Sequence, residues 1–229
     1  MSQITIGRTL DNLGKPIQGT GITLDSNSVS AKLLLSQKNM VLFTNPITNE
    51  LGAAVELKNT DGSISHKGFA IMPPNASGPP EHIHPAYEEY FEVVEGEVLF
   101  SLNGKKIIMQ AGEKVIVQKN VKHTFKPTGK NSISVLVEAK PIGKLNEVVH
   151  NIFGLAHDGK LDKKGQPKFW QGIAFGNELQ DDTLFTSPPI PVQKFMFKLL
   201  GNYAKKLGYS ALYEEYMDDG FWKRRVEQI

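Results

Sequence analysis

The central part of the chain is a series of short runs in which apolar and polar residues alternate. One run contains Ala53, Val55 and Leu57, and a turn at residues 59–62 separates it from a second run that ends at Met72. A period of two is typical of strands with one buried face, and asparagine, aspartate and glycine mark the turns between them. Further runs of this kind lie at residues 90–94, 98–102, 106–109, 115–117 and 133–137. Many short strands at close spacing predict an antiparallel β-barrel or sandwich.

The clearest local signal in this region is the dipeptide Asn103-Gly104. It lies between the apolar runs 98–102 and 106–109. Asparagine followed by glycine suits the tight turn that joins two antiparallel strands. We therefore expect these two runs to pair as a β-hairpin.

The first 44 residues are more polar and contain several glycines. Every second position from Val29 to Leu35 is apolar, which predicts an isolated strand. Pro46, between two asparagines, predicts a turn over residues 45–49. We therefore expect residues 1–44 to form an N-terminal arm with short strands.

After Pro141 the apolar residues recur with the spacing of helices. One predicted helix contains Val148, Val149, Ile152, Phe153 and Ala156. A second has one face filled by Val192, Phe195, Met196, Leu199, Leu200, Tyr203 and Leu207. Pro191 suits the first turn of this helix and Gly208 suits its C-terminal cap. The predicted organisation is a barrel over residues 45–140 and a helical extension over residues 141–229.

The apolar face of the second helix needs a partner. Packing against the barrel or a second subunit is favoured, and a role at a membrane surface is the alternative.

Composition narrows the choice of partners. The chain has 26 Lys and Arg against 24 Asp and Glu, a formal charge of +2. So balanced a chain predicts no nucleic-acid partner and no membrane partner. The absence of cysteine excludes disulfides, thiolate metal sites and cysteine nucleophiles. The first ten residues lack a basic segment followed by an apolar run, so we expect no signal peptide and a cytoplasmic location.

Three histidines and one glutamate have the spacing of a metal site. His82 and His84 are two residues apart, so in a strand they project from the same face. Glu89 begins the next strand, and His123 follows a hairpin and a further strand, near the end of a strand whose turn forms around Asn120. Three imidazoles and one carboxylate suit a divalent transition metal such as Fe, Mn, Ni, Co or Zn. An octahedral ion on four protein ligands keeps two open positions.

Buried histidines with satisfied hydrogen bonds are the alternative interpretation of this group. Three histidines with a glutamate at matched spacing favour the metal. The other histidines have no partner at ligand spacing, so we expect His66, His150 and His157 to be surface or core residues. Among the neighbouring glutamates, Glu88 is the nearest rival of Glu89 as the fourth ligand. Glu92 and Glu95 are expected to face outward.

These residues resemble the two sequence motifs of the cupin superfamily. The first reads His82-x-His84, four residues, Glu89, six residues, Gly96, and the second runs from Gly112 to His123. The resemblance covers about residues 45–140. It implies a single antiparallel jelly-roll barrel, mostly β, that binds one metal ion.

Some positions depart from the family pattern. Gln118 stands where the family usually has proline, Asn120 where it has glycine and Pro127 where it often has asparagine. Gly78 is closer to His82 than in the common form. None of these departures removes a ligand, and Asn120 can adopt the left-handed conformation that the turn needs.

The resemblance leaves the reaction open, because one fold hosts many functions. The stretch before Glu89 is similar to that of small bacterial flavonol dioxygenase-like cupins, which implies a metal-dependent oxygenase with Glu89 as ligand and base. A non-catalytic module that binds a small molecule, and a metal-dependent isomerase or cyclase, are the alternatives.

The alternation of side chains along a strand also predicts which residues surround the metal. Phe91 and Val93 share a face with Glu89, and Phe125 shares one with His123. These side chains either form the wall of a substrate pocket or simply fill a small barrel. We also expect a homodimer, since a small barrel has strand edges that need cover.

Overall fold

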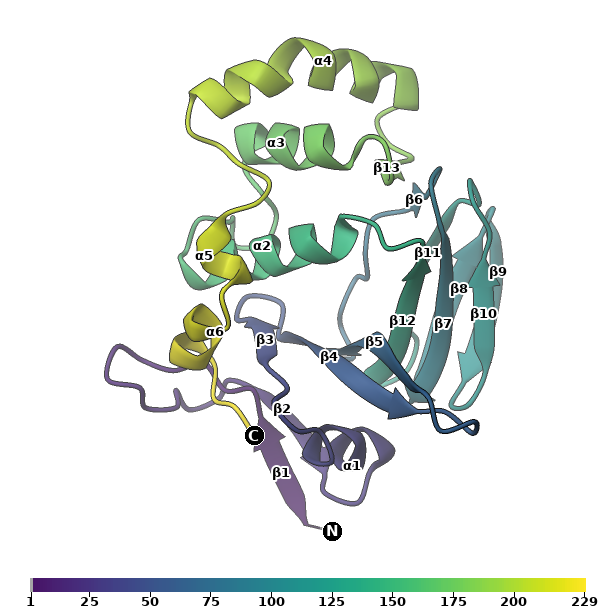
Figure 1. Ribbon diagram of the computed structural model, residues 1–229, viewed down its shortest axis with the longest axis vertical. Helices are drawn as coiled ribbons and strands as arrows, with labels where there is room; N and C mark the ends of the chain where they lie inside the picture. The colour runs from purple at the N-terminus through teal and green to yellow at the C-terminus, as the bar shows by residue number, and fades with distance from the viewer. Residues whose placement is uncertain (1) are drawn as a thin grey trace.

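The computed structural model describes residues 2–229 and shows a β-barrel with helices stacked along one side (Figure 1). The larger of its two antiparallel sheets consists of β3 (Leu42–Asn45), β4 (Glu50–Lys58), β5 (Ile64–Met72), β7 (Glu88–Glu95), β10 (Lys114–Val117) and β12 (Ile133–Lys140). The smaller consists of β6 (His82–Ile83), β8 (Glu97–Leu102), β9 (Lys105–Gln110), β11 (His123–Pro127) and β13 (Leu184–Phe185). Neighbouring strands run in the orders β10-β7-β12-β5-β4-β3 and β13-β6-β11-β8-β9. The mostly-β, antiparallel jelly-roll barrel expected from the sequence is confirmed.

The interior of the barrel is filled by side chains that alternate along each strand. In β7 the odd positions from Glu89 to Val93 are buried and the even positions are only partly covered. Phe91 and Val93 join Phe100 and Val135 in one buried apolar cluster. This alternation fixes the register of the strand, because a slip by one residue would turn the buried set outward.

The hairpin predicted at Asn103-Gly104 is confirmed. Strands β8 and β9 pair from Glu97 opposite Gln110 to Leu102 opposite Lys105. Asn103 and Gly104 have φ angles of 49° and 81°, the left-handed region that this turn requires.

The N-terminal part contains a two-stranded sheet of β1 (Gln3–Ile6) and β2 (Ile22–Asp25), followed by a helix, α1 (Val29–Leu35). The prediction of a strand over Val29 to Leu35 is therefore wrong. The hydroxyl of Ser28 accepts a hydrogen bond from the backbone N–H of Ala31 and caps the helix. Ala31 and Leu34, three residues apart, are the buried apolar positions, so the helical period prevails over the apparent alternation.

The helices of the extension are α2 (Leu145–His157), α3 (Phe169–Leu179), α4 (Ile190–Lys206), α5 (Glu214–Met217) and α6 (Asp219–Arg225). Helix α2 packs against β3 on the outer face of the larger sheet, where α5 and α6 also contribute to a second apolar core. The C-terminal residues meet the N-terminal arm: Arg8 donates two hydrogen bonds to the carboxylate of Glu227, at 2.6 and 2.7 Å. The arm thus packs on its own chain.

Helix α4 does not bury the apolar face that the sequence suggested. It lies on α3, away from the barrel (Figure 1). The buried positions of α4 are Gln193, Phe197, Gly201 and Ala204. A Cβ at Gly176 of α3 would lie 2.2 Å from the ring of Phe197, so the two helices are close because small residues line their contact. The prediction that the apolar face of this helix packs on the barrel is therefore wrong. Its packing on a second subunit stays a prediction.

Candidate metal centre

The candidate site lies between the two sheets, at the end of the barrel nearest to α3 and β13 (Figure 1). The three histidines come from the smaller sheet and its loop, since His82 begins β6, His84 follows it and His123 begins β11. His82 and His123 are directly opposite partners in the sheet. Glu89 projects toward them from β7 of the larger sheet. His123 therefore follows the turn around Asn120 as the first residue of a strand, and the prediction that placed it near a strand end is wrong.

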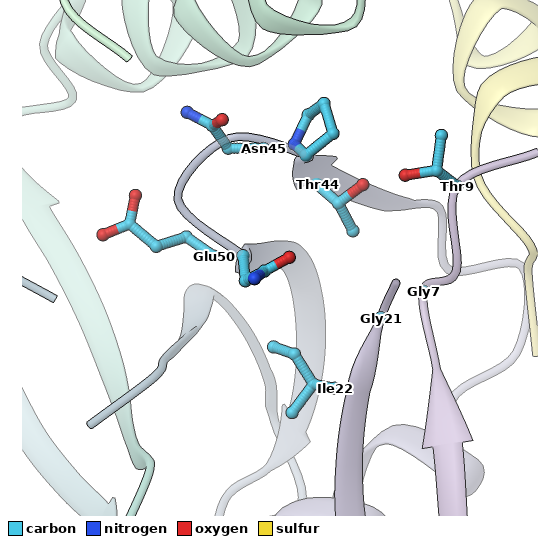
Figure 2. Close-up of a pocket in the computed structure, with 9 residues that line it drawn as sticks. Gly7, Thr9, Gly21, Ile22, Thr44, Asn45 and Glu50 are labelled. Carbon is cyan, nitrogen blue, oxygen red and sulfur yellow. The ribbon is translucent and has the colours of Figure 1, made fainter. Parts of the chain in front are cut away.

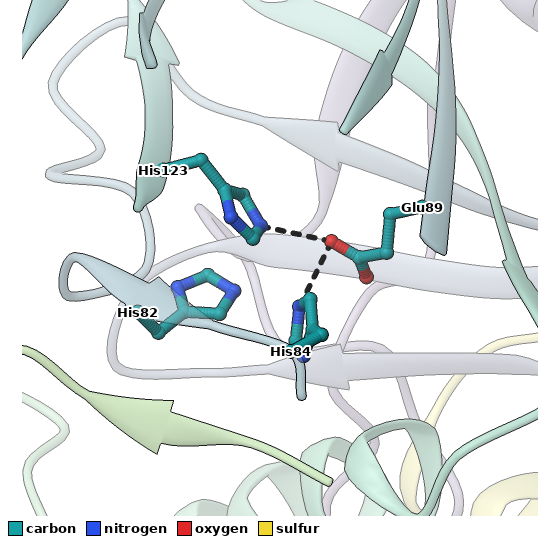
Figure 3. A group of neighbouring side chains, drawn as sticks. All are labelled: His82, His84, Glu89 and His123. Atoms are coloured by element: carbon teal, nitrogen blue, oxygen red, sulfur yellow. Dashed lines mark hydrogen bonds and ion pairs between the residues drawn. The ribbon is translucent and has the colours of Figure 1, made fainter. Parts of the chain in front are cut away.

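The structure brings His82, His84, Glu89 and His123 together (Figure 3). One candidate ligand atom from each residue lies within 4.8 Å of the others, and all four side chains are buried. The Oε2 atom of Glu89 is 3.0 Å from Nε2 of His123 and 3.1 Å from Nε2 of His84. Such a set of nitrogen and oxygen atoms is typical of the first coordination shell of a transition metal.

A backbone carbonyl contacts Nδ1 of each imidazole and so orients the ring. Nδ1 of His82 donates to Pro80 O at 2.7 Å, and Nδ1 of His123 donates to Val121 O at 3.0 Å. Nδ1 of His84 is 3.2 Å from Asp182 O. Because a carbonyl oxygen can only accept, Nδ1 carries the hydrogen in all three rings. The neutral form of each ring then presents an unprotonated Nε2 to the centre of the group, as a metal ligand must.

Burial and charge set the protonation of the group. Burial, with the like charges of His123 and His84, lowers the pKa of His82 to about 4, so that ring is neutral at pH 7. For Glu89, burial alone would raise the pKa. The close imidazoles of His123 and His84 outweigh burial and lower the pKa to about 2.

These observations fit a bound cation. Since Nδ1 of His123 faces a carbonyl and Nε2 faces a carboxylate, the ring must carry two protons or share a cation with Glu89. Nε2 of His84 lies 3.1 Å from Glu89 Oε2 but lacks a hydrogen bond of acceptable geometry among the described residues. A buried nitrogen placed in this way suits a ligand atom that points at a metal.

Sequence reasoning missed the residues that support His84. The ring of Tyr87 stacks on that of His84 with centroids 4.2 Å apart, and both side chains are buried. The Thr183 hydroxyl is 3.1 Å from His84 Nδ1 and 3.0 Å from the Tyr87 hydroxyl. Thr183 lies just before β13, whose Phe185 pairs with His82. A short segment of the helical extension thus completes the smaller sheet beside the site.

The turns that flank the ligands explain how the local sequence places them. Pro85 favours an extended backbone at His84. Gly78 has φ of 73°, and a Cβ there would lie 1.8 Å from Phe125 O, so only glycine allows this loop to cross β11. Asn120 has φ of 62°, as predicted, and its backbone N–H donates to His84 O at 3.0 Å. The turn before His123 is thereby tied to the loop that carries His84.

The neighbouring glutamates point elsewhere. The Tyr90 hydroxyl donates to Glu88 at 3.1 Å, on the opposite face of β7 from Glu89. Glu92 pairs with Lys114 at 3.1 Å and Glu95 accepts from the backbone of Ser30. The structure thus does not bring Glu88, the predicted rival ligand, into the group.

The three remaining histidines also lie outside the group. His66 is exposed on β5, His150 packs on Phe43 with ring centroids 3.9 Å apart, and His157 lies 3.2 Å from the Thr44 hydroxyl. Each is a surface or partly buried residue of the fold.

The predicted pocket residues lie close to the ligands. The ring of Phe91 is 6.4 Å from that of His123 and 5.1 Å from that of Phe125, measured between centroids. Phe91 and Val93 are fully packed in the barrel core, while Phe125 is partly exposed. The packing of Phe91 and Val93 agrees with the filled-barrel alternative, and contact with a substrate stays a prediction.

A second hollow lies where the N-terminal sheet meets β3 (Figure 2). Thr9, Thr44, Asn45 and Glu50 line it, and its volume of about 10 Å³ is enough for one water molecule. Burial raises the pKa of Glu50 in spite of a hydrogen bond from Thr48. The hollow is too small for a substrate.

Comparison with known proteins agrees with this architecture. Residues 68–137 match the family model of the cupin domain, a span that includes all four candidate ligands. No curated protein matches the chain.

Three solved structures that are similar to the chain each cover less than half of it. One is KdgF from Halomonas sp. (15% identity, 42% of this chain and 83% of that chain, TM-score 0.34). Another is a predicted oxalate decarboxylase from Thermotoga maritima (19% identity, 45% and 93%, TM-score 0.34). A third is a variant of salicylate 1,2-dioxygenase from Pseudoaminobacter salicylatoxidans (16% identity, 39% and 27%, TM-score 0.31). At these scores the likenesses say nothing about the reaction.

Proposed function

Because residues 68–137 form a cupin domain, we propose that this chain is a metal-dependent enzyme, an oxygenase of a small aromatic or enolic substrate. The observation that carries the proposal is the group of His82, His84, Glu89 and His123, whose candidate ligand atoms lie within 4.8 Å of one another, with each imidazole Nδ1 held by a carbonyl. The ion, when bound, supplies Lewis acidity and open coordination positions for an enolic or phenolic oxygen.

Glu89 would act both as a ligand and as the proton acceptor. Both of its histidine contacts use Oε2. Oε1 is the oxygen that would take the proton of the substrate hydroxyl. A carboxylate beside a bound cation is a weak base, because the nearby positive charge favours its ionised form. Proton transfer would therefore require a substrate hydroxyl that is itself acidified, as an enol on a metal is.

The apolar side chains beside the ligands favour an aromatic substrate. Phe91 lies 6.4 Å from His123 and Phe185 of β13 lies 6.4 Å from His82, both between ring centroids, and the partly exposed Phe125 packs on Phe91; Val93 is the predicted pocket residue buried deeper in the same cluster. Aromatic side chains around a few polar groups are typical of small-molecule sites.

Metal analysis of the purified protein followed by oxygen uptake with flavonols, catechols and β-diketones tests the proposal. We expect about one metal ion per chain, since the four residues form one coordination set. Replacing His82, His84 or His123 by alanine should each sharply reduce the metal content. Full occupancy after loss of any two of them would refute the metal centre. Oxygen consumption with one substrate class would support the oxygenase.

The burial of the ligands favours a second candidate function, a binding module that captures a small molecule without turnover. The four residues are at most 5% exposed, so access to the ion is restricted. Saturable ligand binding without any product, in protein that carries its metal, would favour this alternative over the enzyme.

We also propose that the chain forms a homodimer through the edges of its barrel. Strands β9 and β10 end the two sheets, and they expose Ile108 and Ile116. Sheet edges with apolar side chains tend to pair unless they are covered. Ile108→Lys with Ile116→Lys should reduce the mass in solution to that of a monomer. A monomeric mass for the wild-type protein in light scattering at micromolar concentration would refute the dimer.

A further inference from the structure

An exposed apolar stripe runs along α4 beside its contact with α3. It contains Val192, Phe195, Leu199 and Tyr203, and Phe195 and Leu199 are 66% and 63% exposed. The stripe continues onto α3, because the ring of Trp170 lies 5.3 Å from that of Tyr203 and 5.0 Å from that of the exposed Phe169. Contiguous exposed apolar surface of this kind marks an interaction site.

The charge of the helix identifies the kind of partner. In its 17 residues α4 has lysine at positions 194, 198, 205 and 206 and no aspartate or glutamate. All four lysines are exposed, and none of them belongs to an ion pair formed by residues 2–229. We call the stripe together with these lysines the α4 outer face.

A second copy of the chain fits the α4 outer face poorly. Two such faces placed against one another would bring lysines together with no carboxylate on either helix. An anionic surface neutralises the same lysines while it covers the apolar stripe.

We propose that the α4 outer face docks the protein on an anionic lipid surface. Phe195 and Leu199 enter the boundary between headgroups and acyl chains, and Lys194 and Lys198 contact the phosphates. A helix with a cationic side and an exposed aromatic and aliphatic side lies in the plane of the interface. No helix within residues 2–229 is long and apolar enough to cross a bilayer, so the association is peripheral.

From the sequence, the apolar face of this helix was expected to pack on the barrel or on a second subunit, and contact with lipid is the alternative that we now favour. That expectation rested on the apolar period alone. The structure shows that Phe197, Gly201 and Ala204 make the contact with α3, which leaves the larger apolar residues outside.

Flotation of the full-length protein with vesicles tests the proposal. One set consists of phosphatidylcholine alone, and in the other set phosphatidylglycerol replaces part of it. We expect binding to the anionic set at low salt and a steep loss of binding as salt is added. Equal binding to both sets, or no binding to the anionic set, would overturn the proposal.

Two double variants separate the charge from the apolar stripe. Lys194→Gln with Lys198→Gln should weaken binding about 25-fold, since each lysine near an anionic surface changes it about fivefold. The matched control is Lys122→Gln with Lys126→Gln, which removes the same charge from the barrel surface and should leave binding close to that of the wild type.

Phe195→Ser with Leu199→Ser should weaken binding by about tenfold for each side chain. Leu13→Ser with Ile64→Ser is the control, because these two residues are exposed to a similar or greater extent but lie elsewhere. Both pairs are on the surface, so the melting temperature should hold. If Phe195→Ser with Leu199→Ser instead lowers the oligomeric mass without lipid, or leaves vesicle binding unchanged, the lipid surface is the wrong partner.

Discussion

Replacing Thr183 by valine tests whether the helical extension positions a metal ligand. Valine keeps the shape of threonine and removes only the hydroxyl, which lies 3.1 Å from His84 Nδ1 and 3.0 Å from the Tyr87 hydroxyl. Nδ1 would retain Asp182 O at 3.2 Å. The Tyr87 hydroxyl is buried and would lose the hydrogen-bond partner that holds it over His84.

The structure sets the expected magnitudes. Loss of an outer-shell partner of a metal-binding histidine weakens metal affinity about 10- to 100-fold, and we expect about 10-fold because Asp182 O remains. The unpaired Tyr87 hydroxyl should lower the free energy of unfolding by about 1–3 kcal/mol. Thr183→Ser is the matched control: it keeps the hydroxyl and loses one methyl group, so its metal affinity should stay near that of the wild type.

Competition with a chromogenic chelator measures the affinity, and denaturant unfolding of the metal-free proteins measures the stability. The positioning role predicts that Thr183→Val loses affinity and that Thr183→Ser restores it. If both variants bind metal as the wild type does, Thr183 serves the fold alone. If both bind equally weakly, the hydroxyl is not the group that matters.

Three further predictions concern single side chains. Glu89→Gln keeps the shape of the ligand and removes its charge, so activity should fall further than metal content, whereas Glu88→Gln should change neither; equal losses would exclude a proton-transfer role for Glu89. Burial lowers the pKa of His157 to about 4, so the unfolded chain binds the proton first as pH falls from 6.5 to 4, and the free energy of unfolding drops by up to about 3 kcal/mol. His157→Gln should make the free energy of unfolding of the metal-free protein depend less on pH in this range. An unchanged slope would contradict the lowered pKa. Gly143→Ala would place a Cβ 2.3 Å from the Tyr87 ring and should lower both the melting temperature and the metal content, measured side by side; wild-type values for both would show that the ring moves freely.

The parts of the fold that the sequence predicted correctly depend on short-range patterns. The hairpin at Asn103-Gly104 needs only two residues that tolerate positive φ between alternating runs. The histidine pair at 82 and 84 likewise needs only the period of a strand to share a face. Glu89 could be added because it begins the next strand, whereas His123, expected near a strand end, is the first residue of β11.

The parts that were missed depend on long-range contacts. Thr183 follows His84 by almost a hundred residues, and no local pattern around it indicates a role at the site. In α4, the larger apolar residues suggested a buried face, but Gly201 and Ala204 allow the close approach to α3. In α1, the apolar residues fit the period of a strand and that of a helix about equally, and the cap at Ser28 favours the helix.

The candidate metal centre therefore depends on the barrel together with the extension. Asp182 and Thr183 hold the ring of His84, and β13 adds a strand beside His82. The buried side chain of Gln193, in the first turn of α4, donates to Phe185 O at 2.6 Å and so fixes β13 to the helix that we propose for lipid contact. A barrel cut at residue 140 would keep all four ligands and lose these supports. Metal affinity measured on such a fragment would understate that of the whole chain, because two of the groups that orient His84 would be missing.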